Sequence, residues 1–237
     1  GDRPVPGDGL VIAGGMNGSA VFEVADDEPA EPLSLHAARP PGDMDPADVV
    51  TAEAFARVGL MGNPSDGFFG RTVAATVANF KATVTVWPDR SPAGARGRVT
   101  LTPHPVFDAA VFANVAQASA VAAREGYSGG TLLLSACLHR LYRLLSERGM
   151  LPPDASSRGF VAKWHTTIPR QVGLAGSSAI LTAFVRAMLS FWGLAGRPDL
   201  LDKAGLGPEG GPSFVLAVET EELGISAGLQ DRVAQWW

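Results

Sequence analysis

The sequence is poor in cysteine and histidine. Cys137 is its one cysteine among 237 residues, so an internal disulfide is impossible and a small disulfide-stabilised secreted domain is excluded. Cys137 lies among leucines in a stretch with helical spacing, which favours a core residue in a reduced, cytoplasmic protein over a nucleophile. The four histidines show none of the spacings typical of metal ligands.

Long apolar runs are absent as well. No stretch approaches the roughly 20 apolar residues of a membrane-spanning helix. The opening "GDRPVPGDG" has no basic region followed by an apolar one, as a secretion signal would have. We therefore expect neither a membrane span nor secretion, and 46% hydrophobic residues over this length indicate a soluble globular protein.

Basic residues are scarce only in the N-terminal part. Nine acidic residues from Glu23 to Glu53 face one base, Arg39, which gives that segment a charge of −8. From residue 54 onward, 17 bases against 13 acids leave the body of the chain near +4. A mildly basic body suits a small anionic ligand better than nucleic acid, which needs a dense basic patch with interleaved aromatics.

Composition also divides the chain. Residues 1–53 are acidic, rich in Pro and Gly, and able to bury little surface, so we interpret them as a linker or the end of a preceding domain. Residues 54–237 contain the strand-like runs "FARVGLM", "FKATVTVW", "RVTLT" and "FVAKWHTTI". Helical spacing follows in "GGTLLLSACLHRLYRLLSERG", "SAILTAFVRAMLSFWG" and "SFVLAVETEELG", the last two closed by Gly193 and Gly224. This mixture predicts an α+β fold.

The stretch "TTIPRQVGLAGSSAILTAF", residues 166–184, places a glycine-rich loop before a helix. The first turn of a helix presents unpaired N–H groups and a positive dipole end, which favour a phosphate. Gly173 and Gly176 allow a close approach of the backbone, and the hydroxyl of Ser177 or Ser178 is able to cap the helix or reach a metal ion. A plain turn with a capping serine explains the same letters about as well.

Two further stretches carry charged residues next to glycine-rich turns. The first, "ARVGLMGNPSDGFFGRT", holds Arg57, Asp66 and Arg71 around one loop after a strand. The second, "VETEELGISAGLQDRVAQ", holds Glu219 on a helix and Asp231 after a break at glycines. Taken singly, each is also explained as an ordinary turn or a solvated helix face.

Taken together and in this order, the three stretches resemble the GHMP kinase family, and within it the plant and algal glucuronokinase branch. "PRQVGLAGSSA" is similar to the family's phosphate-binding motif, Pro, three residues, then Gly-Leu-Gly-Ser-Ser-Ala, with a variation at Ala175-Gly176. The segment from Arg57 to Asp66 corresponds to the family's N-terminal motif, with Asn63-Pro64-Ser65 replacing the usual residues. The resemblance covers about residues 54–237.

The resemblance implies a ribosomal protein S5 domain 2-like fold, the N-terminal half of a GHMP kinase, truncated before the C-terminal domain. The family's glycine-rich third motif is missing, and the sequence ends six residues after Asp231. We therefore expect residues 54–237 to be an incomplete kinase domain whose partner is the missing C-terminal kinase half.

The resemblance also implies ATP and Mg²⁺ as cofactors and assigns roles to individual residues. Asp231 and Arg57 become catalytic, Asp66 binds sugar hydroxyls, and Ser178 with Glu219 holds the metal; Thr220 and Glu222 remain alternatives to Glu219. The residues expected at the nucleotide are Pro169, Gly173, Leu174, Ala175, Gly176, Ser177, Ser178 and Ala179. A sugar acid also needs a cation for its carboxylate, and Arg71 and Arg170 are the candidates beside the loops.

These roles predict a sugar-acid 1-kinase that converts D-glucuronate to glucuronate 1-phosphate with ATP. Galacturonate or arabinose is the alternative sugar. A non-catalytic fragment that only binds a ligand or partner is the alternative from a different class. The expected partner is thus a small-molecule sugar acid, with neither nucleic acid nor membrane involved.

Overall fold

The computed structural model describes residues 11–15, 18–22, 39–102, 110–112, 114–116, 118–119, 131–169 and 172–237. The chain forms two compact units, Gly1–Ser34 and Leu35–Trp237. In the first unit, strands β1 (Val11–Gly15) and β2 (Gly18–Phe22) pair antiparallel. The second, main unit holds the three stretches around Arg57, Ser177 and Asp231.

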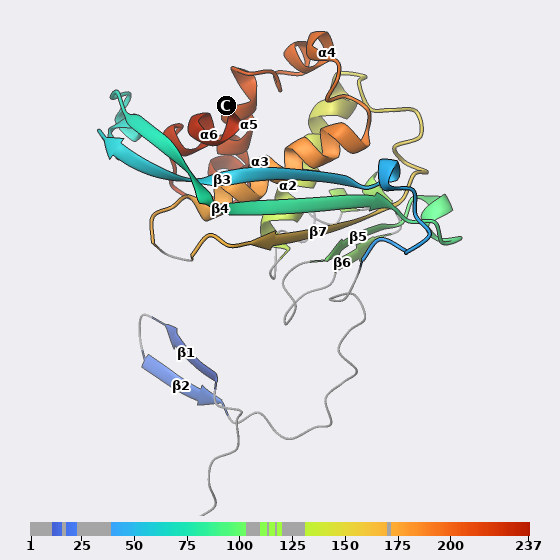
Figure 1. The fold of residues 1–237 in the computed structure, drawn as a ribbon, viewed down its shortest axis with the longest axis horizontal. Coiled ribbons are helices and arrows are strands. Elements are labelled where there is room, and N and C mark those ends of the chain that lie inside the picture. Colours follow the sequence, from blue (N-terminus) through green and yellow to red (C-terminus); the bar gives the residue numbers. More distant parts are fainter. Residues whose placement is uncertain are drawn as a thin grey trace, which may run out of the picture. The chain divides into compact units, whose positions relative to one another are not determined.

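A five-stranded sheet forms one layer of the main unit (Figure 1). Its order is β3-β4-β7-β5-β6, with β3 at Val50–Met61, β4 at Val73–Pro88, β5 at Val99–Thr102, β6 at Ala110–Phe112 and β7 at Phe160–Thr166. Only β5 and β7 pair in parallel among these neighbours. Alternating apolar and polar residues along β4 and β7 explain why one face packs inward while the other stays polar.

The main unit begins earlier than the sequence analysis placed it. Strand β3 starts at Val50, and residues 50–53 pair with residues 83–86 of β4. Ala54 and Ala56 are buried on the helix side, and Val50 and Ala52 pack partly buried against the same core. Residues 50–53 were assigned to the acidic segment because Glu53 and the nearby aspartates mask this two-residue alternation.

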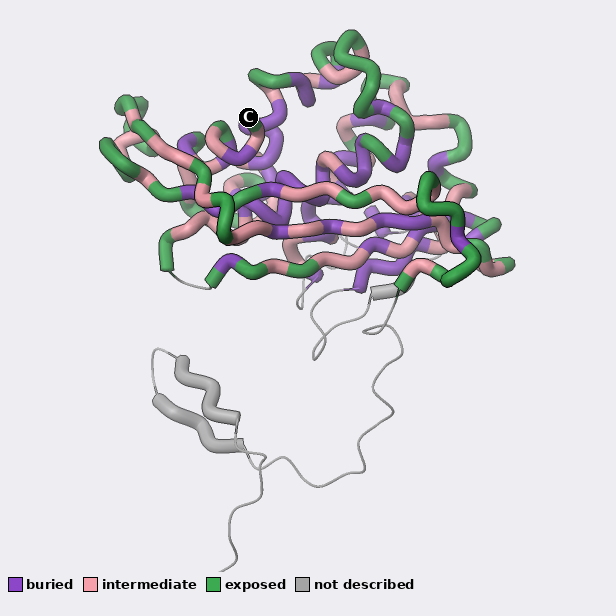
Figure 2. Tube along the Cα trace, viewed as in Figure 1, coloured by how far each residue is buried: buried purple, intermediate pink, exposed green. Residues whose placement is uncertain are grey.

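Helices cover one face of the sheet (Figure 1). Helix α2 spans Leu132–Glu147 and α3 spans Gly176–Phe191; α4 (Pro198–Lys203), α5 (Gly210–Ala217) and α6 (Gln230–Trp236) follow. Twelve of the sixteen residues of α3 are buried, so this helix forms the centre of the core between sheet and outer helices (Figure 2). The predicted α+β class and the helices "GGTLLLS…" and "SAILTAF…" are confirmed.

The predicted helix "SFVLAVETEELG" is confirmed in place but not in type. After α5 the chain widens into the π-helix η4, Val218–Glu222, before Gly224 turns the backbone at φ +65°. Three single-turn 3₁₀ helices lie elsewhere, η1 (Pro46–Asp48), η2 (Ser65–Phe68) and η3 (Gly94–Arg96). A π-helical turn is rare and is frequently found at functional sites. Glu219, which lies within η4, is therefore a candidate functional residue.

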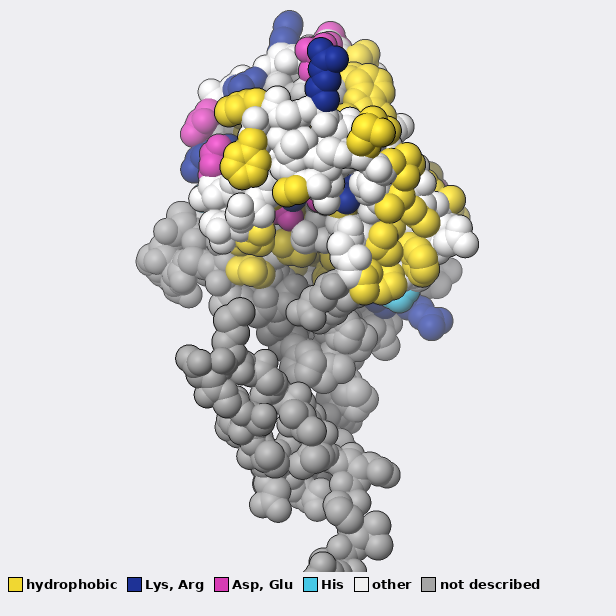
Figure 3. Space-filling view, turned by 90° about the vertical axis from the view of Figure 1, so that its left-hand side faces the viewer, with side chains coloured by type: hydrophobic (Ala, Val, Ile, Leu, Met, Phe, Trp, Pro, Cys, Tyr) yellow, Lys and Arg dark blue, Asp and Glu magenta, His cyan; other side chains and the backbone are white. Residues whose placement is uncertain are grey.

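The β3–β4 hairpin extends beyond the helices at one end of the main unit, and Figure 3 views that end, where hydrophobic side chains gather. The exposed large apolar residues of the hairpin, of α6 and directly after it include Leu60, Met61, Phe68, Phe69, Val73, Val233 and Trp237. No helix among the described residues is long and apolar enough to cross a membrane.

Candidate active site

A cavity of about 650 Å³ lies at the N-terminal end of α3, between the preceding loop, β7, α2 and the start of α6. Most of its wall is apolar, and its charged lining residues are Arg57 and Asp231. The lining consists of Arg57, Asn63, Leu132, Leu133, Trp164, Thr166, Ile168, Pro169, Val172, Gly173, Leu174, Ala175, Gly176, Ser177, Ile180 and Asp231. An apolar cavity with a few convergent polar groups is the usual form of a small-molecule site.

The loop that opens α3 is held by residues distant in sequence. Gly173 has φ +74°, and Ala175, the residue before the helix, has φ +58°, a left-handed conformation that is uncommon outside glycine. The backbone N–H of Arg57 donates to the Leu174 carbonyl at 3.2 Å, and Gln235 Nε2 donates to the Ala175 carbonyl at 2.9 Å. Strand β3 and helix α6 together therefore fix the shape of this loop.

The two adjacent serines differ in position. Ser178 is buried, and its hydroxyl donates to the Ala175 carbonyl at 3.2 Å. Ser177 lines the cavity, and its hydroxyl donates to Glu219 Oε1 at 2.7 Å. Neither serine caps the helix, because the cap position is Ala175. Of the two serines, Ser177 lines the cavity, and the metal-binding role expected of Ser178 stays a prediction.

The spacing of apolar residues does not separate the two serines. Leu181, Thr182 and Val185 follow Ser178 at helical spacing and are buried, but Ile180, Leu181 and Phe184 follow Ser177 at the same spacing and are buried too. The fold is needed to show that Ser177 lines the cavity. Of the other predicted loop residues, Pro169, Gly173, Leu174, Ala175 and Gly176 line the cavity, whereas Ala179 lies in the core.

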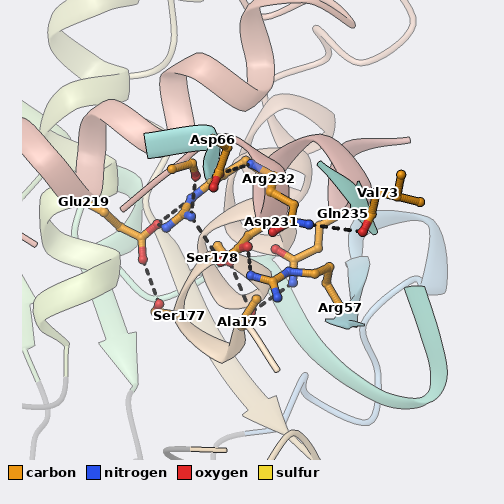
Figure 4. A network of polar contacts seen from close by, with 12 residues as sticks. Arg57, Asp66, Val73, Ala175, Ser177, Ser178, Glu219, Asp231, Arg232 and Gln235 are labelled. Carbon is orange, nitrogen blue, oxygen red and sulfur yellow. Dashed lines mark hydrogen bonds and ion pairs between the residues drawn. The ribbon is translucent and has the colours of Figure 1, made fainter. Parts of the chain in front are cut away.

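Asp231 and Arg57, predicted as catalytic, meet in the cavity. Arg57 lies on β3 and Asp231 on the first turn of α6, and the guanidinium forms an ion pair with Asp231 Oδ1 (Figure 4). Desolvation by burial lowers the pKa of Arg57, and the charge of Arg232 lowers it further, against the opposing effect of Asp66. Arginine is effectively always protonated in proteins, so the guanidinium keeps its charge at neutral pH.

Glu219, predicted as the metal's acidic ligand, is buried beside the cavity. Its Oε1 accepts from Ser177, and its Oε2 accepts from Arg232 Nε at 2.8 Å and from the Arg232 terminal nitrogen (Figure 4). The alternative Glu222 instead forms ion pairs with Arg140 and Arg143 of α2, and Thr220 donates to a helix carbonyl. Glu219 is therefore the acidic residue of η4 that reaches the cavity edge.

Arg232 was not singled out in the sequence. Its guanidinium lies between Glu219 and Asp231, with Asp231 Oδ2 at 3.2 Å. Its side chain is 4% exposed, and it follows Asp231 directly on α6. The position of Arg232 next to a candidate catalytic aspartate was a signal in the sequence that it belongs to the site. Its ion-pair partner Glu219, however, lies 13 residues earlier, and this contact is recognisable only in three dimensions.

The predicted sugar-binding residues lie outside the described cavity. Asp66 Oδ2 accepts from the backbone N–H of Gln230 at 2.9 Å, so Asp66 is engaged at the first turn of α6. Arg71 is exposed, and its carbonyl accepts from the Ser65 hydroxyl at 3.1 Å. The family motif placed Asp66 at the sugar, and Arg71 was chosen as a cation beside the substrate loop, but neither residue lines the cavity. Arg170 lies outside the described residues.

Comparison with known proteins identifies relatives of this arrangement. Residues 132–235 match the model of the family described as GHMP kinases N terminal domain. The chain is 36% identical over 194 residues to Glucuronokinase 1 of Arabidopsis thaliana, covering 82% of this chain and 48% of that protein. It is 37% identical over 182 residues to Probable glucuronokinase 2 of the same plant, covering 77% and 44%. The chain thus spans about half the length of the curated relatives it matches.

Solved structures share the fold. The Methanococcus jannaschii mevalonate kinase aligns with a TM-score of 0.55 at 16% identity, covering 83% of this chain and 52% of that one. Lactococcus lactis galactokinase complexed with galactose aligns with a TM-score of 0.56 at 16% identity, covering 80% and 42%. The family model, the curated relatives and the shared fold together show that this chain belongs to the GHMP kinase family and carries its N-terminal domain.

Proposed function

We propose that the protein is a sugar-acid 1-kinase that transfers the γ-phosphate of ATP to the anomeric hydroxyl of D-glucuronate, giving glucuronate 1-phosphate. One observation carries the proposal. One cavity brings together a helix N-terminus, the Ser177 side chain, which is hydrogen-bonded to the buried Glu219, and the Arg57–Asp231 ion pair. The curated relatives are named glucuronokinases, which supports the choice of sugar.

The phosphate side of the cavity is the N-terminal end of α3. The first turn presents backbone N–H groups without intrahelical partners, and the positive end of the helix dipole favours an anion there. Gly173 and Gly176 both line this end, so no side chain on either residue blocks the approach of a phosphate. The loop thus binds and orients the triphosphate through its backbone.

The residues present fit a magnesium ion that accompanies the phosphates. Mg²⁺ prefers oxygen ligands and is usually bound through one or two carboxylates and substrate phosphates, which matches the Ser177 hydroxyl and Glu219 carboxylate. Within the described part of the chain no cluster of three or more His, Cys, Asp or Glu forms a site of its own. When bound, the ion would neutralise charge on the transferring phosphate.

Asp231 acts on the acceptor hydroxyl. Its carboxylate lines the cavity and is held by Arg57 through Oδ1 and by Arg232 through Oδ2, which fixes its orientation. A carboxylate so placed positions the sugar hydroxyl and accepts its proton as the new phosphate bond forms. Arg57, the cationic residue among the described cavity lining, stabilises negative charge developing between the two substrates.

The experiment is a coupled assay of ADP formation on the protein expressed from its complete reading frame. D-glucuronate, D-galacturonate, L-arabinose and D-galactose are compared at equal concentration. We expect the highest kcat/KM with glucuronate and product phosphorylated at the anomeric position, checked by NMR.

Asp231→Asn should lower kcat by about a hundredfold or more while ATP binding persists, since the carboxylate acts on the acceptor hydroxyl. A preference for another sugar would reassign the substrate, and activity of Asp231→Asn near the wild-type level would remove Asp231 from the mechanism.

A further inference from the structure

We propose that Arg232 is a positioning residue that couples the two halves of the active site, by holding Glu219 toward the phosphates and Asp231 toward the acceptor hydroxyl. This inference rests on the proposed kinase function. It assigns to Arg232 no contact with either substrate, since Arg232 does not line the cavity.

Arg232 contacts one oxygen of each of the two carboxylates, Glu219 and Asp231. Arg232 binds Glu219 through Oε2, which leaves Oε1 to accept from Ser177 at the cavity. It approaches Asp231 at Oδ2, which leaves Oδ1 for Arg57. In both carboxylates one oxygen faces Arg232 and the other faces a residue that lines the cavity (Figure 4).

Arg232 is itself held in one orientation. Its Nη1, the nitrogen that also approaches Asp231, donates to the Gly228 carbonyl at 2.7 Å, four residues earlier in the chain. Gly228 leaves no room for a side chain, because an added Cβ would lie 2.1 Å from Asp66 Oδ2. The guanidinium is therefore fixed by the loop before α6 as well as by the two carboxylates.

Burial argues for a functional role of this charge. The side chains of Arg232 and Glu219 are 4% and 1% exposed. Replacing a buried ion pair by apolar residues is often neutral or stabilising, so such a pair is weak evidence for a stabilising role. Arginine alone has a planar fork able to serve two carboxylates and a carbonyl at once, which lysine cannot reproduce.

The test compares Arg232→Met and Arg232→Lys with the wild type and with a matched control, Arg158→Met. Arg158 is partly buried, donates to the Phe191 carbonyl at 3.2 Å and lies against the Phe191 ring, at the opposite end of α3. Each variant is titrated calorimetrically with a non-hydrolysable ATP analogue at several Mg²⁺ concentrations, and kcat and KM for glucuronate are then measured.

We expect Arg232→Met to need roughly 10- to 100-fold more Mg²⁺ for half-maximal analogue binding, the range typical when a residue that orients a metal ligand is lost. Its kcat should fall while the KM for glucuronate stays within about threefold, since no sugar contact is removed. Arg232→Lys should recover part of the loss, and Arg158→Met should leave the Mg²⁺ dependence unchanged.

A melting-temperature cycle provides a measurement that needs no ligand. Arg232→Met should lower the melting temperature more than the double variant Arg232→Met/Glu219→Gln, because the single change leaves a buried carboxylate without its cation. An equal Mg²⁺ midpoint in the wild type and Arg232→Met, with an active wild type, would overturn the inference alone. A wild type that neither binds the analogue nor forms ADP would overturn the proposed function, and this inference with it.

Discussion

Neighbouring residues on a helix face different surroundings. At the start of α3, Ser177 lines the cavity while the adjacent Ser178 is buried. Successive residues are rotated by about 100° around a helix axis. Ser178 faces the core and bonds the Ala175 carbonyl, while Ser177 faces Glu219 and the cavity. Ser177 is therefore the serine whose hydroxyl is available at the cavity to the proposed metal ion.

The pair Ser177→Ala and Ser178→Ala tests this choice. Ser177→Ala should weaken Mg²⁺-dependent binding of an ATP analogue by roughly tenfold or more, since one oxygen beside Glu219 is lost. Ser178→Ala removes a hydroxyl bonded within α3 and should leave that dependence unchanged. Calorimetric titrations with and without Mg²⁺ measure both. The reverse order of effects would restore Ser178 as the metal-binding serine.

Asp89 predicts how stability depends on pH. Burial raises the pKa of its carboxyl, but hydrogen bonds from Arg98 and Ser91 lower it more, so the pKa lies below the usual value. Arg98 Nε donates to Asp89 Oδ2 at 2.6 Å and Ser91 N donates to Oδ1 at 3.0 Å. Because the folded state binds this proton more weakly than the unfolded state, the carboxylate stabilises the fold above pH ~4 and progressively less below it.

Urea unfolding between pH 6 and pH 3 measures the effect. The wild type should lose unfolding free energy as the pH falls, and Asp89→Asn should be less stable at pH 6 and show a flatter curve. Asp48→Asn is the control, since Asp48 and Arg90 form an exposed pair, which contributes little. Parallel curves for Asp89→Asn and the wild type would exclude Asp89 as a source of the acid sensitivity.

At the scale of elements, the short helix α6 organises the site. Asp231 and Arg232 on its first turn hold Arg57 and Glu219, and Gln235 on its last turn donates to the carbonyls of Phe55 and Ala175. The Trp236 carbonyl accepts from Arg186 of α3 at 2.5 Å. This helix therefore joins β3, the phosphate-side loop and α3.

Gln235→Leu should separate this role from simple stability. The change leaves the Phe55 and Ala175 carbonyls without the Gln235 donor in a buried place, at a cost of about 1–3 kcal/mol in the free energy of unfolding. It should also weaken binding of an ATP analogue, because the loop before α3 loses an anchor. The control is Gln230→Leu on the same helix, whose amide donates to the Val73 carbonyl on the hairpin at 3.2 Å. Equal losses of nucleotide binding in both variants would contradict a specific role of Gln235.

The sequence predicted elements better than contacts between them. Helices α2 and α3 and strands β4 and β7 carry local periodicity, which follows from the residues themselves. The π turn at Glu219 does not, since its wider backbone turn is a feature of tertiary packing. Asp231 and Arg57 were placed by motif and do meet. Asp66 accepts from the backbone N–H of Gln230, a contact the motif did not reveal, and its role at the sugar stays a prediction. Contacts between distant residues require the fold.

At the scale of the whole molecule, charge and core are distributed unequally along the chain. The acidic residues of the segment Glu23–Glu53 contrast with the mildly basic remainder that contains the candidate site. Within the described residues, the core consists of residues from Ala54 to Val218, with Val50 and Ala52 packed against it. The proposed anionic substrates would therefore meet a part of the chain whose own net charge does not oppose them.

Two N-terminal deletions test where the main unit begins. A chain starting at Leu35 should melt within about 2 °C of the full chain, because the main unit starts there and its core residues are all retained. A chain starting at Ala54 loses the pairing of residues 50–53 with β4, the Glu53–Lys81 ion pair and the Glu53 carbonyl that accepts from Arg186. Its melting temperature should fall by roughly 5 °C or more, since 1 kcal/mol corresponds to about 2–4 °C for a domain of this size. Melting temperatures of the three chains, measured by circular dichroism, decide the boundary. Equal melting temperatures for the chain from Ala54 and the full chain would place the boundary at residue 54. A much lower melting temperature for the chain from Leu35 would place it before Leu35.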